Sequence, residues 1–243
     1  MAAGSGTLRL DCQALNPELA GLIRPLLMEA AGSLELAAHF FSFTLVVDDL
    51  PGVGEAPVPW LHLAEGRKRE GRQPEDGLPQ EGPNWHGELF CAETHFLEGA
   101  VADAGLLPGP EIWDAVLRPV EAEPTEAGPI GGTFREAAAR RLLHHELLTA
   151  RDWARRELVG AAIPRQAVES FAVVWAVTVD GRLHRLGLPG YSMAERRNRF
   201  SRHFSSAGVL LPDHWEIFQS LWDGAVAGWP DVLALLRHLP GSS

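Results

Sequence analysis

The sequence predicts an α+β protein whose N-terminal part is rich in strands and whose C-terminal part is mainly helical. Residues 1–104 contain several short runs of β-branched and aromatic residues bounded by turn formers, a pattern typical of strands. From residue 133 onward, apolar residues recur at helical spacing, which indicates amphipathic helices. Apolar residues make up 46% of the 243-residue chain, enough to build a core without disulfides.

Four segments of the first part have the composition of strands. Residues 7–12 alternate between apolar and polar side chains, and residues 36–47 are rich in Phe and Val, which predicts one or two strands ending at the turn formers that follow. Two further strands are expected at residues 58–63 and 85–95.

One short helix is expected between the first two strands. Asn16-Pro17 has the pattern of an N-cap followed by proline at the first helical position, and the helix should run to about Ala31. Pro25 predicts a kink or an early stop, because proline lacks the N–H that an interior helical position needs.

Two segments have the composition of connections. Residues 64–84 contain Leu78 as their one large apolar residue and predict a mobile loop. Residues 105–132 contain an acidic run and many prolines, and predict a linker between residues 1–104 and residues 133–243. The alternative is that both parts form a single domain.

The second part begins with the firmest helical pattern. Thr133-Phe-Arg-Glu136 has the spacing of a capping box, and the helix that it opens should reach about Leu158. Residues 171–179 and 182–188 flank Asp180-Gly181 and predict a β-hairpin with a type I′ turn. Two or three further helices are expected after Ser192, after Pro212 up to Gly224, and at residues 230–238.

The composition indicates the cellular compartment and the kind of genome from which the protein comes. Two cysteines, the lack of a signal-peptide pattern and the lack of a span of about 20 apolar residues predict a soluble, cytoplasmic protein with no membrane span. Lys68 is the one lysine of the chain, which favours a GC-rich, bacterial genome.

Charge is divided unequally along the chain. Residues 1–130 carry a net charge of −14 and residues 131–243 a net charge of +3. The first part should therefore repel nucleic acid, whereas the second need not.

The densest group of metal-ligand side chains lies between residues 86 and 98. His86 and Glu88 share one face of an extended strand, and imidazole with carboxylate is the ligand set of catalytic zinc or iron. With His95 as a third ligand, these residues predict a site for a divalent transition metal. The alternative is a polar, half-exposed strand.

Arginines gather in two segments of the second part. They stand on the helix after Ser192 and on the second arm of the predicted hairpin, and guanidinium groups suit phosphate or carboxylate. If the segments are adjacent, they form one positive surface for nucleic acid, or they pair with the carboxylates of the first part. The residues are Arg182, Arg185, Arg196, Arg197, Arg199 and Arg202.

Two further patterns favour structural roles. Adjacent His144 and His145 project about 100° apart on a helix, so they cannot bind one metal ion together, and we expect one to pack near the core and one to meet solvent. An aromatic stripe at residues 215, 218 and 222 predicts core packing.

No complete catalytic set is present in the sequence, so the function favoured is a non-enzymatic binding or regulatory protein that acts on another protein. One alternative is a metal-dependent hydrolase or oxygenase using His86, Glu88 and His95. The other is nucleic-acid binding through the helix from Arg196 to His203.

Overall fold

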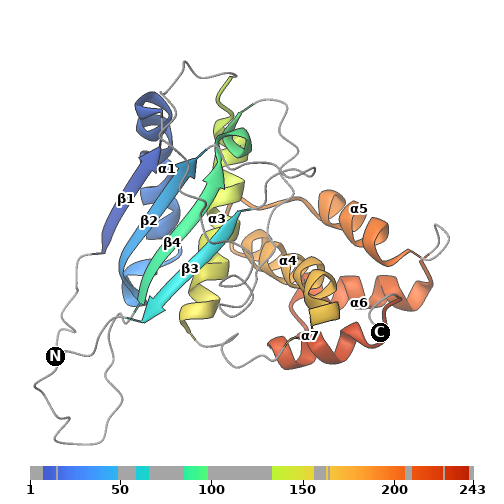
Figure 1. The fold of residues 1–243 in the computed structure, drawn as a ribbon. Helices are drawn as coiled ribbons and strands as arrows, with labels where there is room; N and C mark the ends of the chain where they lie inside the picture. Colours follow the sequence, from blue (N-terminus) through green and yellow to red (C-terminus); the bar gives the residue numbers. More distant parts are fainter. Residues whose placement is uncertain are drawn as a thin grey trace, which may run out of the picture.

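The computed structural model describes residues 8–14, 16–48, 59–65, 85–97, 133–155, 163, 165–205, 210–226 and 228–240. It confirms the α+β class. A four-stranded sheet is backed on one face by helices α1 and α3, and a cluster of helices α4 to α7 stands beside it (Figure 1). We call the sheet with α1 and α3 the sheet half, and α4 to α7 the helical half.

The sheet is formed by β1 (Arg9–Ala14), β2 (Phe40–Asp48), β3 (Trp60–Glu65) and β4 (Trp85–Ala92), in the order β1-β2-β4-β3. The first three strands of this order are parallel, and β3 pairs antiparallel with β4. Leu45 lies opposite Cys12 on one side and Leu89 on the other, and all three are buried. All four strand regions expected from the sequence are thus confirmed, although Leu36–Ala38 forms a 3₁₀ turn before β2.

Helix α1 (Pro17–Ser33) begins as the sequence predicts. The Asn16 side chain accepts hydrogen bonds from the Glu18 and Leu19 amides. The expected early stop at Pro25 is wrong, since the helix continues for two further turns. Side chains on both sides of Pro25, including Ile23 and Leu27, are fully buried, and this packing offsets the cost of the missing hydrogen bond.

Helix α3 (Glu136–Ala154) begins two residues later than the capping box predicts, and the expected end at Leu158 lies outside the described residues. No side chain caps it. Phe134 instead forms an antiparallel bridge with Leu97, and the Arg135 amide donates to the Phe96 carbonyl. The backbone of this segment is therefore used in pairing with the end of the sheet half, and the capping box at Thr133 does not form.

The predicted β-hairpin at residues 171–188 is wrong, because this stretch lies in helix α4 (Val168–Arg185). Its central residues are buried on every side, so the polar positions that reveal a helical period are missing. Gly181 has a packing role rather than a turn role. A Cβ atom there would lie 2.2 Å from the Trp222 carbonyl oxygen, so glycine lets α6 approach α4 closely.

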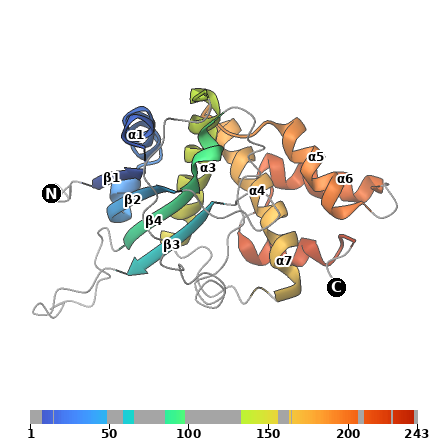
Figure 2. The same cartoon turned by 45° about the horizontal axis from the view of Figure 1, so that its top comes forward.

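The remaining helices confirm the sequence predictions. Helix α5 (Met193–Phe204) opens with a capping box between Ser192 and Glu195. Helix α6 (Pro212–Asp223) ends at Gly224, which has a φ of 76°, a conformation that favours glycine. Helix α7 (Trp229–Leu236) packs with α6 against α4 (Figure 2), and Phe218 and Trp222 of the aromatic stripe are buried.

One apolar core runs through both halves, from Cys12 of β1 to Leu239 after α7. Helix α3 belongs to the second part of the sequence but packs on α1 and on the sheet. The predicted linker at residues 105–132 lies outside the described residues. So does the predicted loop at 64–84, except for Ala64 and Glu65, which end β3. Among the helices described, none is long and apolar enough to cross a membrane.

Candidate functional site

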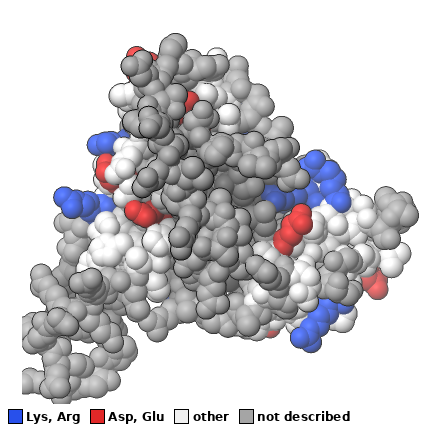
Figure 3. All heavy atoms as spheres, viewed as in Figure 1, with Lys and Arg blue, Asp and Glu red and all other residues white. Residues whose placement is uncertain are grey.

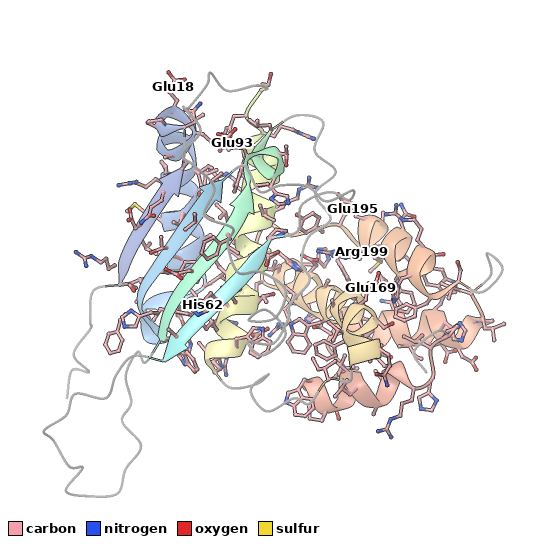
Figure 4. All side chains as sticks on the ribbon, in the orientation of Figure 1. Glu18, His62, Glu93, Glu169, Glu195 and Arg199 are labelled. Carbon is pink, nitrogen blue, oxygen red and sulfur yellow. The ribbon has the colours of Figure 1, made fainter. Side chains whose placement is uncertain are left out.

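The three residues of the predicted metal site do not come together. His86 and Glu88 do share the solvent-facing side of β4, as expected, where His86 hydrogen-bonds with Ser42 and Glu88 with His62 of β3 (Figure 4). His95 follows the other end of β4. That end lies about 20 Å from His86, at ~3.3 Å per residue of strand. It is buried, and its ring accepts a hydrogen bond from the Ala92 amide.

Within the described ranges, no group of three His, Cys, Asp or Glu side chains is placed to hold a metal ion. The nearby thiol does not change this result. Burial raises the pKa of Cys91 well above its ordinary value, so the thiolate form that binds metals or attacks carbonyl groups is disfavoured. The metal-dependent enzyme stays a prediction without support from these residues.

The fold does not bring the six arginines of the predicted anion surface together on one face, although Arg182 and Arg185 of α4 line one pocket. Arg196 is 3% exposed and pairs with Asp180, whereas Arg182 pairs with Asp152. Both carboxylates belong to the second part of the sequence, so the expected pairing with the acidic first part is wrong for these two residues.

The other four arginines point to different surroundings. The Arg197 guanidinium lies 5.0 Å from the centre of the Trp215 ring, and Arg185 donates to the Trp222 carbonyl. Arg199 extends from the side of α5 that faces the rest of the molecule (Figure 4), and Arg202 is exposed. On the face seen in Figure 3, the basic side chains of the described residues, all arginines, stand in separate places with acidic side chains between them.

A buried polar cluster joins α3, α4 and α5. We define it as His145 and Glu146 of α3, Asp180 of α4, Arg196 of α5, and Tyr191. Their exposed fractions run from 0 to 6%. Asp180 is its centre: one carboxylate oxygen accepts from the Tyr191 amide at 3.0 Å and lies 3.1 Å from His145 Nδ1, while the other accepts from Arg196 Nε.

This arrangement favours one tautomer of His145. The Asp180 oxygen 3.1 Å from Nδ1 can only accept a hydrogen bond, whereas Arg196 Nη2, 3.4 Å from the same nitrogen, can only donate one, so a proton on Nδ1 makes the shorter of the two contacts. Burial lowers the pKa of His145 below its ordinary value, which favours the neutral ring. Burial alone would raise the pKa of Asp180, but His145 and Arg196 beside it hold that pKa below its ordinary value.

The pKa of Glu146 is shifted in the opposite direction to that of Asp180. It is 2% exposed, and burial raises its pKa to about 8. One of its carboxyl oxygens has no hydrogen-bond partner, and neither does the nearby Tyr191 hydroxyl. Glu146 is therefore neutral at pH 7, while Asp180, which has Arg196 and His145 as partners, is ionised.

Perturbed carboxyl, imidazole and phenol groups packed together are typical of functional sites, although structural ion-pair networks perturb pKa values too. In this cluster the ionised groups contact each other directly and are sealed between helices. The sequence does not reveal this cluster, because its members are 35 and 16 residues apart, as in His145–Asp180 and Asp180–Arg196. The expectation that one of His144 and His145 meets solvent is also wrong, since both are buried.

The outer edge of β1 is blocked by side chains. The Asp11 carboxylate accepts from the Cys12 amide at 2.9 Å, and Arg24 of α1 donates to the Cys12 carbonyl at 3.3 Å. Both backbone groups of Cys12 are thereby occupied, and charged residues stand at the edge. A partner that adds a strand to a sheet needs such groups free, so this edge disfavours that type of binding.

The outer face of α1 is different, because it exposes apolar side chains. Leu22 is 45% exposed and Met28 is 59% exposed, and Pro25 between them is also exposed. Gly21 and Gly32 on the same helix have open space where a Cβ atom would stand. We call the surface formed by Leu22, Pro25 and Met28, with the two glycines beside them, the α1 face.

No protein family, curated protein or solved structure matches the chain.

Proposed function

We propose that the chain is a non-enzymatic binding protein that acts through protein–protein contacts, and that a basic amphipathic helix of its partner docks on the α1 face. The observation that carries the proposal is the exposure of Leu22 and Met28, at 45% and 59%. Isolated exposed apolar residues are common, but several on one helix face suggest a binding surface.

The inner side of α1 does not account for these residues. Leu19, Ile23, Leu27 and Ala30 already anchor the helix to the core with no exposed surface. Leu22, Pro25 and Met28 are exposed and lie within an arc of about 120° on the outer side of the helix, away from these anchors. Full burial of an exposed side chain of this size is worth roughly 1.5–3 kcal/mol, and a partner that covered Leu22 and Met28 would gain about half of that for each, because they are 45% and 59% exposed.

The acidic residues on and around α1 favour a basic partner. Helix α1 exposes Glu18 and Glu29, and the Glu29 side chain stays 44% exposed although it pairs with Arg140; the one cation of the helix, Arg24, pairs with Asp11. Residues 1–130 carry a net charge of −14. This charge attracts a basic partner and repels an acidic one. Glycine at residues 21 and 32 leaves room for close approach of a second helix backbone.

The test uses the full chain and a fluorescent synthetic helix that carries leucine on one face and lysine on the other. The variant replaces Leu22 and Met28 with serine. Its control replaces Leu186 and Leu211, which are 59% and 57% exposed elsewhere, with serine. Fluorescence anisotropy should show binding to the unmodified chain and to the control, with Kd at least about tenfold higher in the α1 variant, a change of ~1.4 kcal/mol.

Equal affinity of both double variants for the Leu/Lys helix would contradict docking on the α1 face. Lack of binding to the unmodified chain would contradict the basic partner. A Leu/Glu helix of the same length should bind at least about tenfold more weakly, and equal binding of the two peptides would show that charge plays no part.

A further inference from the structure

We infer that helix α5 is a pH-sensitive latch, which stays docked while the buried Glu146 carboxyl keeps its proton and leaves its place on α4 and α6 when that proton is lost. This device lies in the helical half and does not depend on the α1 face. Two features carry it: the excess of carboxyl groups in the buried polar cluster, and the small number of side chains that anchor α5.

The buried polar cluster contains two carboxyl groups and one guanidinium. Asp180 and Glu146 both lie in the interior, and Arg196 beside them donates from Nε to Asp180. One oxygen of Glu146 has no hydrogen-bond partner. Because Asp180 already holds the cation, a second negative charge at Glu146 would be costly in this place. The docked cluster therefore accommodates Glu146 as a neutral acid.

The elements packed around Glu146 bring titratable or charged groups toward it. These groups are Cys91 of β4, His145 of α3, Asp180 of α4, Tyr191 in the segment before α5, and Arg196 and Arg199 of α5. Burial raises the pKa of Glu146 to about 8 and outweighs the attraction of the two arginines, which lowers that pKa. The pKa values of Cys91 and Tyr191 are raised as well, and that of His145 is lowered. Glu146 is therefore the member of this group that changes charge near pH 8.

Helix α5 is less firmly anchored than the other helices around Glu146. Three of its twelve residues are buried, Arg196, Phe200 and Phe204, whereas thirteen of the eighteen residues of α4 are buried. One of these three anchors belongs to the cluster itself, and the two phenylalanines pack on each other and on α6. The ion pair of α5 with α3, Arg141–Glu195, has side chains that are 31% and 46% exposed, and exposed ion pairs contribute little. Among the walls of the cluster, α5 is therefore the one that can move most easily.

The segment before α5 provides a hinge. Gly187 has a φ of 67°, a conformation that favours glycine, and there is open space where its Cβ atom would stand. At Gly190 a Cβ atom would lie 3.1 Å from an Asp180 carboxylate oxygen, and the Tyr191 amide donates to the same oxygen at 3.0 Å. The end of the hinge next to α5 is thus tied to the cluster, while Gly187 can absorb a change of chain direction once this tie is broken.

Loss of the Glu146 proton favours release of α5. In the docked state the pKa of Glu146 is about 8, and once α5 has left and water reaches the carboxyl, this pKa returns toward 4.5. A group with a lower pKa in the open state makes opening more favourable as pH rises between the two values. His145 and His203 have pKa values lowered from 6.5, so they favour opening toward acidic pH instead. Above about pH 7 the Glu146 effect remains, and opening should increase with pH.

The experiment measures amide hydrogen exchange of the full chain by mass spectrometry from pH 6.5 to 8.5, with rates corrected for intrinsic exchange. Peptides from α5 should be less protected than peptides from β2, which reports unfolding of the sheet half. The Glu146→Gln variant carries a neutral group of the same shape and removes the Glu146 effect while keeping that of the histidines. Relative to this variant, protection of α5 in the unmodified chain should fall at least about tenfold across this pH range.

A matched variant and the sheet half serve as controls. Glu216→Gln changes an exposed carboxyl of α6 and should keep the pH dependence of the unmodified chain. Equal protection of α5 and β2 would mean that α5 leaves only when the whole chain unfolds, and would overturn the latch. The same pH dependence in Glu146→Gln would assign the change to another group and would overturn it as well. So would a protection of α5 that stays constant with pH in the unmodified chain.

Discussion

The sheet half and the helical half use different interactions to fix their geometry. In the sheet half, backbone pairing sets the register, and alternation along β2 buries Phe43, Leu45 and Val47 on one face. Helices have no such register. The helices are instead held by buried ion pairs that cross from helix to helix: Asp180–Arg196 joins α4 to α5 within the helical half, and Asp152–Arg182 joins α3 of the sheet half to α4. Apolar burial drives both halves, while buried charge fixes the helical half and its contact with α3.

The largest effect should come from Asp180. Asp180→Asn keeps the shape of the side chain but leaves Arg196 buried without a counter-charge, so the free energy of unfolding should fall by about 3–5 kcal/mol. Urea denaturation followed by circular dichroism measures it. Asp223→Asn, an exposed carboxyl at the end of α6, should change stability by less than about 0.5 kcal/mol.

The double variant Asp180→Leu with Arg196→Met should recover most of this loss, because replacing a whole buried pair by apolar residues is often neutral. A loss below about 1 kcal/mol in Asp180→Asn would mean that the ion pair does not fix the helical half.

A second test uses the pH dependence of Glu146. Its pKa of about 8 in the folded state lies above its ordinary value of 4.5, so folding favours the protonated form. Stability from this group is complete below pH 4.5 and is lost as pH rises toward 8, at ~1.4 kcal/mol per pH unit, or about 4 kcal/mol between pH 5 and 8.

The Glu146→Gln variant should lack this slope and be the more stable protein at pH 8. His145 and Asp180 have lowered pKa values, which act with the opposite sign, so the quantity to measure is the difference in unfolding free energy between the two proteins from pH 5 to 8. A difference that does not change with pH would show that Glu146 is ionised in the folded protein.

Replacing glycine by alanine should change the stability of the protein in opposite directions in the two halves. At Gly181 the added Cβ would overlap the Trp222 carbonyl, and such overpacking costs roughly 1–3 kcal/mol. At Gly21 of α1 there is open space, so alanine should stabilise by roughly 0.4–1 kcal/mol through its helix propensity and a less flexible unfolded chain. Thermal unfolding of both variants measures the two changes, and equal shifts in Tm would contradict the prediction.

The smallest effect on stability is expected at the edge of β1. Asp11→Ala with Arg24→Ala frees the backbone groups of Cys12. Because both side chains are about half exposed, stability should change by less than about 1 kcal/mol. Self-association should increase, since an unprotected edge pairs with other strands. Sedimentation velocity measures it, and an unchanged monomer fraction would show that these side chains do not protect the edge.

The sequence predicted those elements whose signals are local. Asn16-Pro17, the Ser192–Glu195 capping box and Gly224 each act within one turn of a helix end, and the structure confirms all three. Helix α4 was missed because Asp180 and Gly181 have the composition of a turn, while their roles depend on α5 and α6. The buried cluster was missed for the same reason, since it is formed by contacts between distant segments and follows no spacing rule.

The bridge between Leu97 and Phe134 makes the chain leave and re-enter the sheet half at a single point. The free energy of closing a chain between two such points grows only with the logarithm of its length, about 0.6 kcal/mol per doubling. A change in the number of residues between Leu97 and Phe134 should therefore cost little closure free energy, as long as the bridge between η2 (Glu93–Phe96) and α3 forms. This junction is accordingly a place where chain length can vary and where a fluorescent reporter can be grafted.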